Sequence, residues 1–172
     1  REAEAQYRAH LAASARALGP DHVDTLVGVN AWSLFLSQAG RTGEGERLER
    51  RTVEQLTRVA GPEHPDTLRA RANLAAILNR QGRHAEAEQV ARGALPALER
   101  VLGAGHPETL LLSGQLAAAR RLQGRADEAE ALDRRVLGEL EARLGRDHPD
   151  TAGAAVDLGL DLLALGRPAE AD

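Results

Sequence analysis

The chain has 172 residues, a formal net charge of −4 and 42% hydrophobic residues, and its only aromatic residues are Tyr7, Trp32 and Phe35. It contains no cysteine, which excludes disulfides, thiolate metal sites and a cysteine nucleophile. The acidic balance argues against non-specific nucleic-acid binding, and no apolar run approaches the ~20 residues needed to cross a bilayer. We therefore expect no nucleic-acid or membrane partner and take a cytoplasmic location as the default. All 22 basic residues are arginine, a usage that suggests a GC-rich bacterial genome.

A seven-residue segment recurs along the chain at constant spacing. It starts at Gly19, Gly61, Gly103 and Gly145, and its last three copies share the pattern Gly-x-x-His-Pro-Asp/Glu-Thr. The interval is 42 residues each time, without insertion or deletion. A fixed period of this length indicates a repeat protein, in which each unit buries its apolar face against its neighbours.

A second marker keeps the same period. It is a Gly-Arg pair followed by small and acidic residues, at Gly40-Arg41, Gly82-Arg83, Gly124-Arg125 and Gly166-Arg167. The two markers together predict a single array with a leading helix at 1–18, full repeats at 19–60, 61–102 and 103–144, and a partial repeat at 145–172. Because the chain begins and ends at the same phase of the repeat, we expect it to be part of a longer protein.

Each repeat reads as two helices, which we call helix A and helix B. In the second repeat, the His-Pro-Asp segment predicts that helix A runs from about 65 to 81, where a glycine caps its end. Helix B is predicted from about 84 until just before Gly103, and its residues Leu95, Leu98 and Leu102 share one face. Pro96 lies inside this helix B and should bend or break it.

The residues Asn73-Leu74-Ala75-x-x-Leu78-x-x-x-Gly82-Arg83-x-x-Glu86-Ala87-Glu88 resemble the tetratricopeptide consensus. The leading Gly-x-x-His-Pro-Asp-Thr and the 42-residue length resemble the kinesin-light-chain subclass of that family. The resemblance implies an all-α, right-handed superhelical solenoid of about eight helices, whose concave face binds peptides or protein segments. The sequence departs from the family pattern at Glu49, Ala91 and Asp133, which replace a large apolar residue, and at His84, which replaces a tyrosine.

Catalytic and cofactor chemistry finds no support in the sequence. The periodic histidines His22, His64, His106 and His148 lie in successive repeats at least ~8–10 Å apart, so they cannot share one metal ion. No serine stands in a nucleophile-elbow context, and carboxylate pairs two residues apart diverge around a helix. We therefore expect no enzyme activity, no metal and no cofactor.

Matching helix A to the family pattern assigns Leu68, Leu74, Ala75 and Leu78 to the core and the adjacent stripe to the concave groove. The predicted peptide-binding residues on this stripe are Asn30, Leu34, Ser37, Gln38, Arg69, Asn79, Arg80, Leu111, Arg121 and Leu122. The same stripe contains the small residues Gly114, Ala118 and Gly153, which would leave a channel along its bottom. Amides there could pair with a peptide backbone, and the arginines could pair with acidic side chains. The alternative is that the exposed leucines, including Leu160 and Leu163, pack against further repeats or form a homodimer through an array end.

These observations favour a protein- or peptide-binding scaffold whose ligand is a segment carrying acidic residues. A second hypothesis makes the chain the sensor or autoinhibitory arm of a multidomain bacterial signalling ATPase or transcription regulator. A P-loop or DNA-binding domain in the same gene would favour that second hypothesis.

Overall fold

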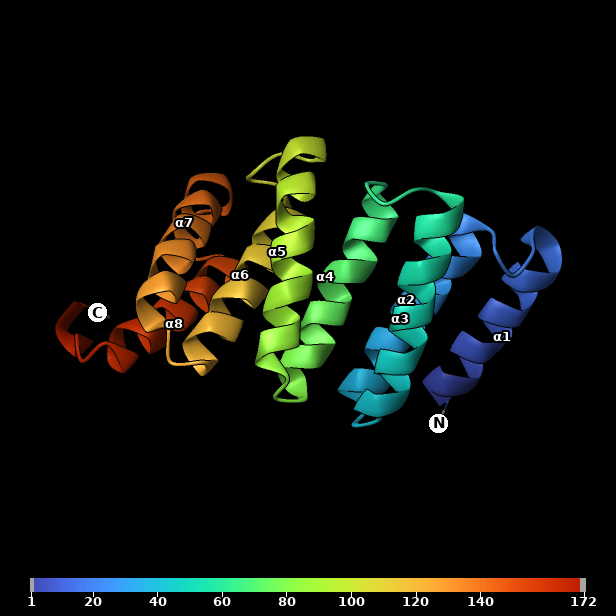
Figure 1. Ribbon diagram of the computed structural model, residues 1–172, viewed down its shortest axis with the longest axis horizontal. Helices are drawn as coiled ribbons and strands as arrows, with labels where there is room; N and C mark the ends of the chain where they lie inside the picture. Colours follow the sequence, from blue (N-terminus) through green and yellow to red (C-terminus); the bar gives the residue numbers. More distant parts are fainter. Residues whose placement is uncertain (1, 171–172) are drawn as a thin grey trace.

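The computed structural model describes residues 2–170, and these residues form eight α-helices, a short 3₁₀ helix at Pro168–Glu170 and no strand. The helices follow one another along the long axis of the molecule, from α1 at one end to α8 at the other (Figure 1). Their bounds are α1 (Glu2–Leu18), α2 (Val23–Gln38), α3 (Thr42–Val59), α4 (Pro65–Arg80), α5 (His84–Val101), α6 (Pro107–Leu122), α7 (Ala126–Leu144) and α8 (Pro149–Ala164). The predicted all-α solenoid is confirmed, with α2, α4, α6 and α8 as the A helices.

Each A helix begins directly after a histidine of the repeated segment. Nδ1 of His64 accepts a hydrogen bond from the backbone amide of Asp66 at 3.3 Å, and His22, His106 and His148 accept the equivalent bond. This bond satisfies one of the amides that the first turn of a helix leaves free. The periodic histidines are therefore helix caps, and no group of three His, Cys, Asp or Glu residues in 2–170 is placed to hold a metal ion.

A threonine and a glycine close three of the loops that lead into the A helices. The Thr67 hydroxyl donates to the carbonyl oxygen of Gly61 at 2.8 Å, and the first and third repeats contain the same bond. Gly61 has a φ of +102°, a left-handed conformation that favours glycine. Within the described residues, the buried hydroxyl of Thr151 has no such partner, so the loop between α7 and α8 departs from this pattern.

The core is built from leucine and alanine at the predicted positions. Leu68, Ala75 and Leu78 of α4 are fully buried, and Leu74 is nearly so. Leu98 of α5 is also fully buried and joins a cluster formed by α4, α5 and α6. Each B helix therefore packs against its own A helix and the next one.

Pro96 does not break its helix, contrary to that part of the prediction. Helix α5 runs without interruption from His84 to Val101 with Pro96 inside it. Proline removes one amide donor, which leaves the carbonyl of Arg92 without its helical partner. Both Pro96 and Arg92 are exposed, so water can satisfy that carbonyl.

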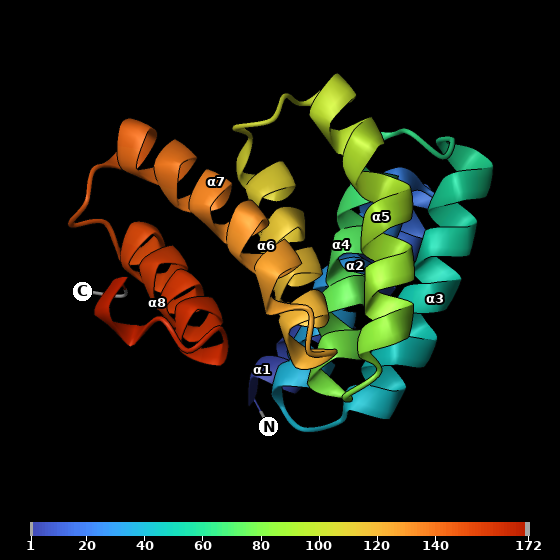
Figure 2. The same ribbon diagram turned by 60° about the vertical axis from the view of Figure 1, so that its left-hand side comes forward.

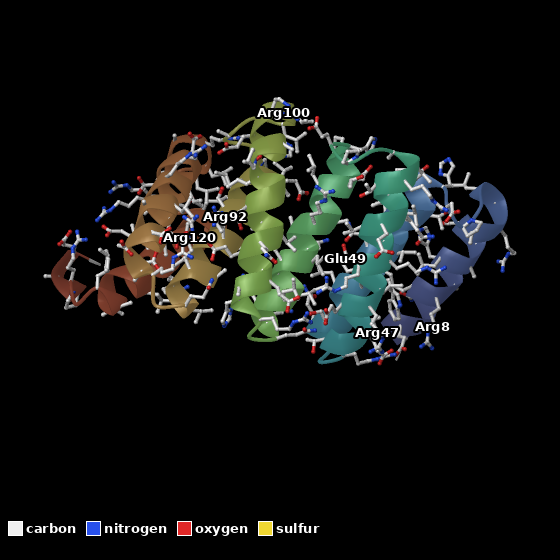
Figure 3. The ribbon with its side chains drawn as sticks, in the orientation of Figure 1. Arg8, Arg47, Glu49, Arg92, Arg100 and Arg120 are labelled. Atoms are coloured by element: carbon white, nitrogen blue, oxygen red, sulfur yellow. The ribbon has the colours of Figure 1, made fainter. Side chains whose placement is uncertain are left out.

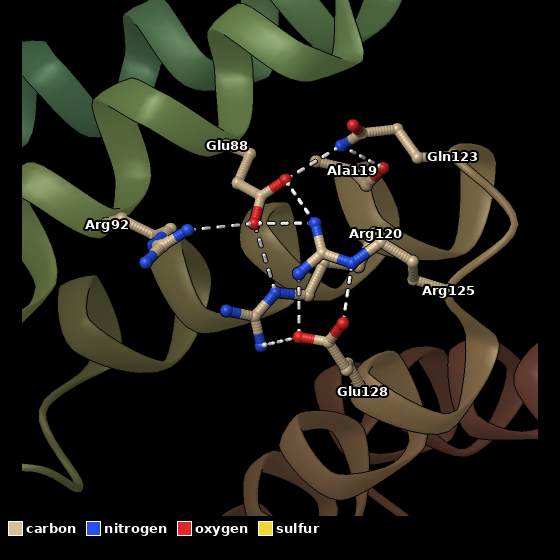
Figure 4. Close-up of polar contacts among 7 residues, drawn as sticks. All are labelled: Glu88, Arg92, Ala119, Arg120, Gln123, Arg125 and Glu128. Carbon is tan, nitrogen blue, oxygen red and sulfur yellow. Dashed lines mark hydrogen bonds and ion pairs between the residues drawn. The ribbon is translucent and has the colours of Figure 1, made fainter.

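An arginine of the Gly-Arg marker ties each pair of successive repeats together. Arg125 donates to Glu88 of the preceding repeat at 2.8 and 3.0 Å and to Glu128 of its own repeat at 2.5 and 2.7 Å. Figure 4 shows the Glu88 carboxylate facing Arg92, Arg120 and Arg125. Burial acts to raise the pKa of Glu88, but the hydrogen bonds from Gln123 and Arg125 outweigh it and hold the pKa below its usual value.

The same bridge occurs at every copy of the marker. The arginine, the glutamate of the preceding repeat and the acidic residue of its own repeat are Arg41 with Glu4 and Glu44, Arg83 with Glu46 and Glu86, and Arg167 with Glu130 and Glu170. The planar guanidinium suits this role because it can hold two carboxylates at once. We call these four arginines the inter-repeat clamps.

Replacing Arg125 by alanine should lower the free energy of unfolding by about 1–3 kcal/mol, because it removes charged hydrogen bonds from the buried Glu88 carboxylate. Urea unfolding followed by circular dichroism measures the change. The matched control is Arg58→Ala, which removes an exposed pair with Asp21 at 2.8 Å and should cost less than about 1 kcal/mol. Equal losses in the two variants would show that the clamp adds nothing beyond an ordinary surface pair.

The last A helix makes few contacts with the one before it. Helix α8 packs on α7, but it contacts α6 less extensively than α4 does. Figure 2 shows α8 beside α7 and separated from α6. None of the helices described in 2–170 combines the length and the apolar character needed to cross a membrane.

Candidate binding cleft between helices α6 and α8

A cleft of about 520 Å³ lies where α6 and α8 diverge over α7. It is lined by Pro107, Leu110, Leu111, Gly114, Gln115 and Ala118 of α6, Asp133, Val136 and Leu140 of α7, and Pro149, Asp150, Gly153, Ala154 and Asp157 of α8. We call it the α6–α8 cleft. It lies where α6 and α8 have few contacts with each other and α7 forms the floor.

Part of the predicted groove stripe lines this cleft. Leu111, Gly114 and Ala118 contribute from α6, and Gly153 contributes from the equivalent position on α8. Leu111 is half exposed at the edge of the cleft, and a Cβ atom added at Gly114 or Gly153 would meet nothing within 4 Å. The small residues therefore leave open space beside an exposed leucine.

Two polar residues of the stripe point to the next A helix. The Asn79 side chain donates to the backbone carbonyl of Gln115 at 2.9 Å. Arg121, one repeat later, lies with its Nε 2.9 Å from Asp161 Oδ1 and its Nη2 3.6 Å from Asp157 Oδ1. These side chains join successive A helices, so the role predicted for them as free ligand contacts needs correction.

The other arginines of the stripe differ from each other in their surroundings. Arg69 lies between Glu108, at 2.8 Å, and Asp66, at 3.3 Å. Arg80 is exposed and has no carboxylate within ion-pair distance among residues 2–170. The remaining predicted residues of the stripe are the exposed Gln38 and Leu122 and the half-buried Leu34.

Asn30 and Ser37 are buried instead of facing a groove. Asn30 is 2% exposed and Ser37 is 3% exposed, because α3 and α4 cover this side of α2. The Asn30 amide lies 2.6 Å from the Asn73 side chain and 2.7 Å from the Glu49 carboxyl. These two residues are therefore inaccessible to a ligand in this structure, and the groove prediction needs correction for them.

Glu49 forms the centre of that buried polar group. Its side chain is fully buried between helices, whereas Arg47 on the same helix is exposed (Figure 3). The Ser33 hydroxyl donates to Glu49 Oε2, and none of these polar neighbours is a cation. Burial raises the pKa of Glu49 to about 8.

The acidic residues of the α6–α8 cleft were not among the predicted site residues. Asp133 is 2% exposed and its Oδ2 accepts no hydrogen bond from an N–H or hydroxyl group within 2–170. Asp157 lies nearer to solvent on α8. The sequence showed that Asp133 replaces a large apolar residue of the family pattern. That replacement indicated a departure from the pattern, but it did not indicate a binding site.

Comparison with known families agrees with this architecture. A family model described as a tetratricopeptide repeat matches residues 29–100, 71–138 and 108–172. The chain belongs to the tetratricopeptide repeat family. Tetratricopeptide repeat proteins generally bind other proteins and generally lack catalytic activity. No curated protein matches the sequence.

Several solved tetratricopeptide repeat structures are similar to this one. A kinesin light chain protein of Podospora anserina with nearly identical TPR-like repeats has a TM-score of 0.81 at 24% identity, over 87% of this chain and 71% of that one. A second structure of that protein, a point variant, has a TM-score of 0.80 at 24% identity, over 99% and 80% of the two chains. BtubC (BKLC) from P. vanneervenii has a TM-score of 0.82 at 21% identity, over 99% and 68%. At these identities the likeness concerns the fold.

Proposed function

We propose that this tetratricopeptide repeat chain is a protein-binding module and that a segment of its partner binds in the α6–α8 cleft. The observation that carries the proposal is the open space between α6 and α8, lined by Leu111, Gly114, Ala118 and Gly153. These residues occupy the stripe that the family pattern assigns to ligand contact. Family membership supports a protein partner over a small molecule.

The surroundings of the cleft favour an elongated ligand. Leu111 is 50% exposed at one wall, and α8 carries further exposed apolar side chains at Val156, Leu160 and Leu163. Exposed apolar side chains that gather on one face favour an interaction site there. A peptide segment can place one side chain in the cleft and lay others along α8.

The alternative ligand is a partner segment with acidic residues, which would bind at the α4 end of the same face. That hypothesis was based on several arginines of the stripe, but Arg69 and Arg121 are already held by carboxylates. Arg80 remains exposed and could pair with an acidic residue of a partner. Replacing Arg80 by glutamate tests this contact without disturbing the buried Asp161.

Filling the cleft should abolish binding without unfolding the protein. A peptide selected from a random phage-displayed dodecamer library on the wild-type protein serves as the probe. In the variant Gly114→Leu/Gly153→Leu, the new side chains enter open space, so the peptide should bind at least about tenfold more weakly by isothermal titration calorimetry. Leucine favours a helix more than glycine does, so the helical signal should persist.

The matched control places the same two leucines away from the cleft. Gly93 on α5 and Gly138 on α7 are exposed, and a Cβ at either meets nothing within 4 Å. Gly93→Leu/Gly138→Leu should leave the affinity for the peptide unchanged. If this control weakens binding and the cleft variant does not, the partner binds the B-helix side and the proposal is wrong.

A further inference from the structure

The α6–α8 cleft has an acidic lining. The ionisable residues that line it are Asp133, Asp150 and Asp157, and no arginine or histidine lines it within 2–170. The neighbouring Arg121 does not neutralise the lining fully, because it is shared between Asp157 and the buried Asp161. The cleft therefore attracts a cation and repels an anion.

Asp133 is a buried carboxyl group at the floor of the cleft, next to Asp161 of α8. It is 2% exposed, and its Oδ2 accepts no hydrogen bond from an N–H or hydroxyl group within the described part of the chain. Burial, then the nearby Asp161 and Asp157 on α8, raise the pKa of Asp133 well above its usual range, while Arg121 on α6 acts to lower it. Asp133 and Asp161 share a side-chain hydrogen bond, which keeps the proton on Asp133. A ligand that brings donors and positive charge would stabilise the ionised form of Asp133 instead.

The preceding pair of A helices lacks this chemistry. The residue one repeat before Asp133 is Ala91, which is fully buried in the core, and the residue one repeat before Asp157 is the neutral Gln115. A buried acid recurs at the equivalent Glu49 two repeats earlier, but Ser33 and Asn30 contact its carboxyl and the residue equivalent to Asp157 there is the neutral Asn73. Among the described A-helix pairs, two acids at these positions therefore occur together only between α6 and α8. Their placement coincides with the junction where the A helices separate.

Apolar side chains flank the acidic group. Val136 and Leu140 of α7 and Leu111 of α6 line the cleft beside Asp133. An arginine or lysine side chain has an aliphatic stem that packs on such surfaces while its charged end reaches a carboxylate. Arginine fits best, because its guanidinium offers several donors in a fixed plane.

We propose that the α6–α8 cleft recognises a partner segment through an arginine side chain that reaches Asp133 and Asp157, with an adjacent apolar residue against Leu111. This inference rests on the proposed function, and it names the chemistry of the ligand. Binding of the guanidinium stabilises ionised Asp133, so the complex should release protons near neutral pH.

The selected dodecamer peptides test the proposal. The sequences that the wild-type protein enriches should contain arginine or lysine next to an apolar residue, and replacing that arginine by the neutral citrulline should weaken binding at least about tenfold. Asp157→Asn, at an exposed position, and Asp133→Asn should each weaken it as well. Asp127→Asn, an exposed residue elsewhere on α7, should have no effect.

Proton release gives a second readout, measured by calorimetry in two buffers of different ionisation enthalpy. The wild-type protein should release protons on binding the peptide, and Asp133→Asn should release fewer. Enriched peptides that are acidic, or that bind equally well after arginine is replaced by citrulline, would overturn the arginine inference. If Gly114→Leu/Gly153→Leu still blocks those peptides, the cleft remains the binding site. Peptides unaffected by that double variant, or the absence of any enriched peptide, would count against both proposals.

Discussion

Replacing Leu98 by alanine should lower the free energy of unfolding by about 2–5 kcal/mol, the range found for buried leucine truncations. Leu98 is fully buried in the cluster that joins α4, α5 and α6, where it packs with Leu68, Leu112 and Leu116. The cavity would therefore weaken two repeats at once. Urea unfolding followed by circular dichroism measures the loss.

Val101→Ala is the control on the same helix. Val101 is 41% exposed, so this truncation removes little buried surface and should cost less than about 1 kcal/mol. If Leu98→Ala were as mild as Val101→Ala, helix α5 would not present Leu98 to the core, and the packing described above would be incorrect.

Replacing Glu49 by glutamine should stabilise the protein at alkaline pH. The folded-state pKa of Glu49 is about 8 and its ordinary value is 4.5. Because the folded state holds the proton more tightly than the unfolded state, the stability from this group is present below pH 4.5 and is lost as pH rises to about 8. In that window the slope is about 1.4 kcal/mol per pH unit.

Glu49→Gln keeps the shape and hydrogen-bonding ability of the protonated carboxyl but cannot ionise. The variant should therefore lose the corresponding slope in a plot of unfolding free energy against pH, and should exceed the wild-type stability by several kcal/mol at pH 8. Glu54→Gln, an exposed position on the same helix, should follow the wild-type curve. A Glu49→Gln curve that also follows the wild type would show that Glu49 is ionised in the folded protein.

Much of the fold could be predicted because the repeat fixes local structure. The His-Pro segment marks the start of the A helices, and the glycines mark the helix ends. The family pattern assigned Leu68 and Leu78 to the core, apolar spacing placed Leu98 on the buried face of helix B, and all three are fully buried. These features depend on contacts within one repeat, or on contacts with the equivalent residues of the next repeat. The sequence of a single repeat is therefore enough to predict them.

The candidate site was only partly predictable, because it depends on how neighbouring repeats pack. The family pattern placed Leu111 on the ligand face, and it lines the cleft. The pattern could not show that Asn79 and Arg121 are engaged by Gln115 and Asp161 of the next A helix. Each of these pairings joins side chains from two different repeats. The residues at the paired positions differ from one repeat to the next, so the pattern of one repeat does not predict them.

The separation of α6 from α8 was also not apparent in the sequence. The Thr-Gly loop motif is intact at Thr151, yet this is the loop whose hydroxyl bond is missing. Asp133 and Asp161 place two carboxyl groups in the α7–α8 interface, where they share a hydrogen bond and burial raises the pKa of both. The cleft thus reflects interactions between helices that local propensity does not encode.

Photocross-linking tests the proposed binding cleft most directly. The photoreactive residue p-benzoylphenylalanine is placed at Leu111, at the edge of the cleft, or at Arg134, exposed on α7 outside the cleft. Each protein is irradiated with the selected dodecamer peptide. A peptide that binds in the α6–α8 cleft should cross-link at position 111 and not at position 134. Cross-linking at position 134 with none at position 111 would contradict the account.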